Sequence, residues 1–137
     1  MAKTFTAPFA QTTKTGTAVL TTASTITTDA ATNAVIVATA GADGAIVTKL
    51  SFMPRATVTA TALYLFLSKD NGTTLRLIDS ELMAAYTMAA TTATPETKFS
   101  NISEDTPLRL EAGDKLYVSI GVALASGIVA KCEWTDF

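Results

Sequence analysis

The chain has 137 residues, of which 48% are hydrophobic and only 16% are charged, and its formal net charge is -2. This length suits a single domain with a substantial core, and the hydrophobic content excludes a wholly disordered chain. The acidic balance and the scattered Lys and Arg residues argue against a nucleic-acid partner, and no apolar run approaches the roughly 18 residues of a membrane span.

Residues 1–16 predict an extended N-terminal arm. Pro8 interrupts any helix there, and Phe5 and Phe9 are the only aromatic residues of the segment. Two phenylalanines on a polar tail would be costly to leave in water, so they are expected to dock, either on the chain's own domain or on a neighbouring subunit. The segment also lacks the apolar core of a signal peptide, which predicts synthesis and retention in a cytoplasm.

Residues 17–137 predict a single domain that begins with short strands. β-Branched residues indicate a strand near residues 17–22 and a short extended piece around residues 24–27. Residues 34–39 form a continuous apolar run, which is typical of a strand covered on both faces. Threonine and alanine fill most other positions, which suits packing against other subunits, although Thr-rich strands need no partner.

Clear turn signals separate the next strands. Gly41–Gly44 predicts a turn, and residues 45–53 then alternate until Pro54, which ends the ladder because it has no N–H. The alternation predicts that four residues share one side of this strand: Ile46, Thr48, Leu50 and Phe52. Residues 63–67 are apolar at every position, which predicts a central strand.

The strongest turn signal is the Asp-Asn-Gly run of residues 70–72, whose residues tolerate the positive φ of a hairpin. Residues 73–79 are the predicted return strand, with Leu75 and Leu77 facing inward. Residues 80–86 are the one helix candidate, because Ser80 can cap a run of good helix formers. Residues 99–102 predict a further short strand.

The C-terminal stretch gives the fold class. One row of its alternating residues is apolar: Leu116, Val118, Ile120 and Val122. The intervening row is mixed, which predicts a sheet with one buried face. About eight strands, closely spaced turns, at most one short helix and no strand–helix–strand alternation predict an all-β fold, an antiparallel β-sandwich.

No pattern in the sequence predicts an enzyme or a cofactor. The chain has no histidine, which removes the commonest general base and metal ligand. Asp79 and Glu81 are the nearest carboxylate pair for a glycoside hydrolase, but their place where a strand ends indicates a solvated turn. Asp70 or Asp43 could offer oxygen ligands to calcium, but no twelve-residue loop ending in Glu follows either residue.

The last strand carries the single cysteine and the single tryptophan. Cys132 excludes an intrachain disulfide, and it shares an apolar face with Trp134. Both are therefore expected to pack in the core or an interface, which argues against Trp134 as a sugar platform. Tyr117, Lys131 and Glu133 lie on outer faces and are weaker candidates for contact with a partner.

Residues 108–118 resemble a known structural motif. A strand, an Ala-Gly-Asp turn and an alternating strand resemble the late hairpin of compact jelly-roll sandwiches, including trimeric tumour-necrosis-factor-like and C1q-like domains. Gly113 permits the tight reversal, and Asp114 can accept backbone N–H bonds across the turn. The resemblance implies a jelly-roll-like sandwich.

The whole chain resembles the small Thr/Ala-rich proteins encoded among the head and tail genes of tailed bacteriophages. The features shared are the N-terminus with Ala7-Pro8-Phe9, the low-charge β-rich body and the ending at residues 133–137. This resemblance implies a virion structural protein made in the host bacterial cytoplasm, in particular a capsid decoration (cement) protein. Such a protein stabilises the head by bridging major capsid protein subunits, commonly as homotrimers.

On this hypothesis the arm residues Phe5, Pro8 and Phe9 contact a neighbouring virion protein, with Tyr117, Lys131 and Glu133 as weaker contacts. The alternative is a carbohydrate-binding or receptor-binding β-sandwich associated with a tail or fibre. That alternative requires an exposed aromatic platform.

Overall fold

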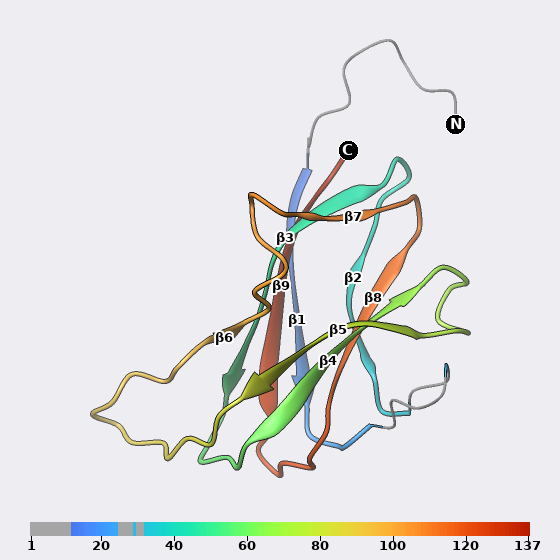
Figure 1. Cartoon of the computed structure of the whole chain (residues 1–137). Coiled ribbons are helices and arrows are strands. Elements are labelled where there is room, and N and C mark those ends of the chain that lie inside the picture. Colours follow the sequence, from blue (N-terminus) through green and yellow to red (C-terminus); the bar gives the residue numbers. More distant parts are fainter. Residues whose placement is uncertain (1–11, 25–28, 30–31) are drawn as a thin grey trace.

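The computed structural model describes residues 12–24, 29 and 32–137. The described residues form nine β-strands and no helix, and the strands make two antiparallel sheets that pack against each other (Figure 1). The predicted all-β sandwich is therefore confirmed.

The two sheets divide the strands as follows. Sheet A has the order β1-β9-β3-β6, with β7 also pairing with β3, and its strands are β1 (Thr12–Leu20), β9 (Ile128–Asp136), β3 (Ala45–Pro54), β6 (Thr97–Lys98) and β7 (Leu108–Leu110). Sheet B has the order β2-β8-β4-β5, and its strands are β2 (Val35–Thr39), β8 (Lys115–Ile120), β4 (Thr61–Ser68) and β5 (Arg76–Met83).

The first strand begins earlier than predicted, at Thr12. Residues 12–16, which were expected in the arm, form the first half of β1 and pair residue by residue with β9, from Thr12 opposite Asp136 to Leu20 opposite Ile128. The rest of the predicted arm lies outside the described residues, as does most of the extended piece expected at residues 24–27.

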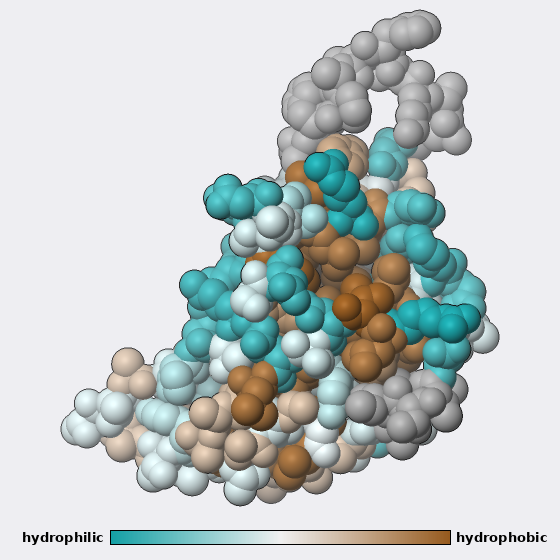
Figure 2. Space-filling model, viewed as in Figure 1, coloured by the Kyte–Doolittle hydropathy of each residue, from teal (hydrophilic) through white to brown (hydrophobic). Residues whose placement is uncertain are grey.

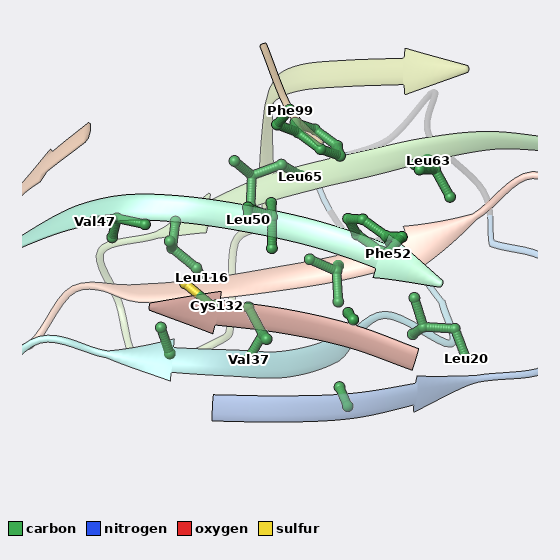
Figure 3. Packing of buried hydrophobic residues seen from close by; sticks show 14 of the residues in the cluster. Leu20, Val37, Val47, Leu50, Phe52, Leu63, Leu65, Phe99, Leu116 and Cys132 are labelled. Carbon is green, nitrogen blue, oxygen red and sulfur yellow. The ribbon is translucent and has the colours of Figure 1, made fainter. Parts of the chain in front are cut away.

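The core fills the space between the sheets with side chains from both of them. Figure 3 shows Leu50 and Phe52 of β3 in one layer with Leu63 and Leu65 of β4. Phe99, in the turn that follows β6, stacks against Phe52 with a centroid separation of 5.4 Å. The segment after β6 therefore covers one side of the core with a buried aromatic ring, although its residues 99–102 are not the strand that was predicted.

The alternation predicted for β3 is broken by a β-bulge. Val47 pairs with Trp134 while Lys49 pairs with Glu133, so the register shifts at Thr48. Val47 and Leu50 consequently both face the core, and the prediction that Ile46 and Thr48 share the side of Leu50 is wrong. The strand ends at Pro54, as predicted.

Sheet B confirms one strand prediction and corrects another. β4 lies between β8 and β5, and Leu63, Leu65 and Phe66 are fully buried, as expected of a central strand. β2 is an edge strand, and its apolar run is not covered on both faces, because Ile36 is exposed while Val37 is buried.

The helix predicted for residues 80–86 is wrong. Ser80 lies opposite Tyr64 and Met83 opposite Thr61, in the second half of β5. Two helical turns are marginal without tertiary support, and pairing with β4 outweighs the small helix propensities of these residues. Tyr86 exchanges two backbone hydrogen bonds with Val58, of 2.9 and 3.0 Å, beyond the end of the strand.

The Ala-Gly-Asp turn also differs from the predicted hairpin. β7 pairs with β3 in sheet A, whereas β8 lies in sheet B, so the turn carries the chain from one sheet to the other. Its expected chemistry is present. Gly113 has a φ of 76°, and the Asp114 carboxylate accepts the backbone N–H of Glu111 at 2.9 Å.

Candidate functional site

An apolar row crosses the outer face of sheet B. Ile36 of β2 lies opposite Tyr117 of β8, Tyr117 opposite Phe66 of β4, and Phe66 opposite Leu77 of β5. We call these four residues the apolar row. They lie on the side of the sheet away from the core because the residues next to them in β8 and β4, such as Leu116 and Leu65, face inward.

The centre of the apolar row is packed and its ends are open. Phe66 is fully buried under Leu75, and Ala34, Tyr64 and Tyr117 complete a small cluster around the two. Ile36 and Leu77 are 39% and 43% exposed at the two ends of the row. Figure 2 shows apolar side chains gathered over the region of β4, β5 and β8 and flanked by hydrophilic residues.

Further apolar residues are exposed along β5. Leu82, opposite Ala62 on the same side of the sheet, is 68% exposed, and Ile78 at the bulge is 41% exposed. Ser80, opposite Tyr64, separates Leu82 from the apolar row on this side of β5. Exposed apolar residues that gather on one face mark surfaces that contact other proteins more often than scattered ones do.

Charges are sparse on this face. β2 and β4 contain no charged residue, and Lys115 is the only one in β8. β5 contains three charged residues. The exposed Arg76 pairs with Asp29 at 2.8 Å. Asp79 and Glu81 lie opposite the inward-facing Leu65 and Leu63 and accept hydrogen bonds from the side chains of Asn101 and Ser100. The carboxylate pair is therefore held in mid-strand at the side of the sandwich, not in the solvated turn that was predicted.

The outer face of sheet A has a different character. Five charged side chains form one connected set of ion pairs there: Lys49, Glu96, Lys98, Lys131 and Glu133. The N–O separations range from 3.4 Å for Lys49 and Glu96 to 4.0 Å for Lys49 and Glu133. Because these charges already pair within the chain, they would gain little electrostatic free energy by pairing with a partner protein.

The structure separates the weaker candidates that the sequence suggested. Tyr117 belongs to the apolar row on sheet B, whereas Lys131 and Glu133 lie on the opposite outer face, where their side chains pair at 3.5 Å. The stronger candidates, Phe5, Pro8 and Phe9, lie outside the described residues.

Sequence reasoning missed Ile36, Leu77 and Leu82. Leu77 was predicted to face inward, but the register between β4 and β5 shifts at Ile78, so Leu77 lies opposite the outward-facing Phe66. Leu82 was predicted to lie in the helix of residues 80–86, and Ile36 was predicted to lie in a strand covered on both faces. The alternating pattern of β8, which places Tyr117 outward, was the one signal that pointed to this face.

The Asp-Asn-Gly turn between β4 and β5 is accounted for by its own hydrogen bonds. The Asp70 carboxylate accepts the backbone N–H of Thr74 at 2.7 Å and the Ser68 hydroxyl at 3.1 Å, and the bond from Thr74 lowers the pKa of Asp70. Asn71 and Gly72 have positive φ, as predicted. No group of three or more His, Cys, Asp or Glu residues that could hold a metal ion occurs within residues 12–24, 29 and 32–137.

Cys132 and Trp134 lie in the core, as predicted. Cys132 is fully buried on the inner face of β9, and burial raises the pKa of its thiol from 9.0 to about 12. Trp134 is 8% exposed on the same face. Neither side chain is available to a ligand on the outside of the sandwich.

No protein family model, no curated protein and no solved structure matches the chain. In the part of the chain that the structure describes, no helix is long and apolar enough to cross a membrane.

Proposed function

We propose that the chain is a non-enzymatic structural protein of a tailed-bacteriophage virion that decorates the capsid and bridges major capsid protein subunits. The assignment to a virion rests on the resemblance of the whole chain to small Thr/Ala-rich phage proteins. The observation that supports a docking role is the outer face of sheet B, where Leu82 and the two ends of the apolar row, Ile36 and Leu77, are exposed and charges are few.

The size of this surface favours action in several copies. Full burial of one Leu or Ile side chain contributes about 1.5–3 kcal/mol, so completing the burial of a few half-exposed side chains gives only a few kcal/mol. A micromolar complex needs about 8 kcal/mol. A weak single contact becomes a lasting one when linked copies bind adjacent sites, which is how a bridging protein on a repetitive shell is held.

The carbohydrate-binding alternative has less support. A sugar platform needs an aromatic ring open to solvent. Among the described residues, every Trp, Tyr and Phe side chain is buried or half-buried, and Trp134 is in the core.

The test is to rebind the purified protein to shells assembled without it. Leu77→Asp places a charge on the apolar row, and Met53→Asp makes the same change at a similarly exposed residue, 39% against 43%, on the outer face of sheet A. We expect wild type and Met53→Asp to co-sediment with shells and Leu77→Asp to lose at least tenfold in affinity.

Two results would contradict the proposal. Wild-type protein that does not bind shells removes the decorating role. Equal binding by wild type and Leu77→Asp removes the outer face of sheet B as the docking surface. Binding to glycans on an array, without shell binding, would favour the receptor-binding alternative.

A further inference from the structure

Within the described residues, β1 forms one edge of sheet A and pairs on one side only. Its nine residues lie opposite nine consecutive residues of β9. Among the described residues, no other backbone group bonds to residues 12–20. The outward-facing N–H and C=O groups of such a strand are a template for pairing with another extended chain, and folded proteins normally protect these edges.

The other sheet edges carry such protection. β2 has only five residues, and its pairing with β8 shifts register between Ile36 and Ala38. β5 is interrupted by the bulge at Ile78 and carries Asp79 and Glu81. On the far side of sheet A, β6 and β7 have two and three residues. Short strands, bulges and charges each oppose pairing between edges.

β1 has none of these devices. It is nine residues long, its register with β9 is unbroken, and it contains no proline. Its one charge, Lys14, is neutralised within the chain by Asp136, with the Nζ and Oδ2 atoms 2.8 Å apart. Its outward-facing row consists of Thr13, Thr15, Thr17 and the apolar Val19, so no like charge in this row opposes a second strand at this edge.

We infer that β1 pairs with β1 of a second copy of this chain, antiparallel and about a two-fold axis. Charge decides between this edge and β5. Self-pairing of β5 about Ser80 would set Asp79 against Glu81, whereas self-pairing of β1 about Gly16 sets Lys14 against Ala18 and Thr15 against Thr17. Opposed threonines stabilise a strand pair, and opposed like charges destabilise it.

The dimer would join two copies of sheet A into one continuous sheet. An antiparallel pair about a two-fold axis is an isologous contact, so it closes at two copies. The outer face of sheet B, which lies on the other layer of each sandwich, stays free in this arrangement. The inference does not depend on the proposed function, because it concerns the free protein in solution.

The test uses like and opposite charges on the free edge. Two double variants are made, one with Thr15→Lys and Thr17→Lys and the other with Thr15→Glu and Thr17→Glu. In a dimer of either variant, like charges face each other in the registers centred on residues 15–17. The two double variants are matched within the fold, since Thr15 lies opposite Glu133 and Thr17 opposite Lys131. Each variant thus gains one unlike and one like neighbour on β9. Thr91→Lys with Thr92→Lys, in an exposed loop, is the control for added charge.

The readout is mass by sedimentation or native mass spectrometry at concentrations of tens of micromolar. We expect dimers for the wild type and the loop control, monomers for each edge variant alone, and dimers again when the two edge variants are mixed in equal amounts. Restored pairing in the mixture also shows that both variants fold.

A monomeric wild type would overturn the inference, as would any oligomer that both edge variants retain. A trimer unchanged by these substitutions would place self-association elsewhere on the molecule. If the wild type is monomeric and substitution at Thr15 and Thr17 abolishes its binding to shells, the β1 edge pairs with a strand of another protein and not with a second copy. Failure here leaves the Leu77→Asp shell-binding test unaffected, so the two ideas can fail separately.

Discussion

Cys132 lies in the core between the two sheets. It is fully buried among apolar side chains on the inner face of β9. Burial disfavours the thiolate and, with a smaller contribution from Glu133, raises the pKa of the thiol to about 12. Cys132 is therefore a packing residue that stays protonated at every physiological pH.

This raised pKa predicts how stability depends on pH. Below pH 9 the thiol is protonated in both the folded and the unfolded chain, and its contribution to the free energy of unfolding is fully present. Between pH 9 and about 12 only the unfolded chain releases the proton, so the free energy of unfolding falls by about 1.4 kcal/mol per pH unit from this group. Urea unfolding of wild type and Cys132→Ala across this range isolates the effect, because other titrations cancel in the difference.

We expect the stability advantage of wild type over Cys132→Ala to be constant from pH 6 to 8 and to shrink above pH 9. A difference that does not change with pH would mean that the thiol titrates equally in the folded and unfolded chains.

At the scale of elements, β1 and β2 approach closely at Gly16. A Cβ atom built on Gly16 would lie 2.1 Å from the carbonyl oxygen of Val37 and 2.9 Å from the Trp134 ring. A backbone carbonyl cannot move aside as a flexible side chain can. The position where the two sheets meet therefore requires a residue without a side chain.

Gly16→Ala is accordingly expected to lower the free energy of unfolding by about 1–3 kcal/mol, the usual cost of overpacking. Gly121→Ala is the matched control, because its added Cβ would first meet the hydroxyl end of Tyr64, at 3.2 Å. Denaturant unfolding of both variants checks the prediction. Equal stability of Gly16→Ala and wild type would show that β1 and β2 can separate at this point.

The elements also show how far sequence patterns reach. Alternation and turn residues predicted β4, β8, β9 and the Asp-Asn-Gly turn, because these depend on local chemistry and on one buried face. The predicted row of β8 was one residue too long, since the strand ends at Ile120 and Val122 is 42% exposed. The bulges at Thr48 and Ile78 were not predictable, since a register shift depends on how two strands pair and leaves no signal in the alternation of either strand alone. Each bulge reverses which residues face outward. Leu77 was for that reason placed in the core, and part of the candidate site was missed.

At the scale of the whole molecule, the sandwich separates two kinds of outer surface. Sheet A carries ion pairs that are satisfied within the chain, and sheet B carries the apolar row. Edge pairing through β1 would assemble copies through sheet A and leave sheet B free to face another protein. The proposed decoration of a shell and the proposed dimer therefore use different parts of the fold.

The composition and stoichiometry of the virion test the proposed function most directly. Quantitative mass spectrometry of particles produced from the genome that encodes the chain would measure its copy number relative to the major capsid protein. A decoration protein is expected in a fixed ratio to the major capsid protein, with copies over the whole shell. Absence from the particle, or a few copies per particle as in a neck or fibre, would contradict the account.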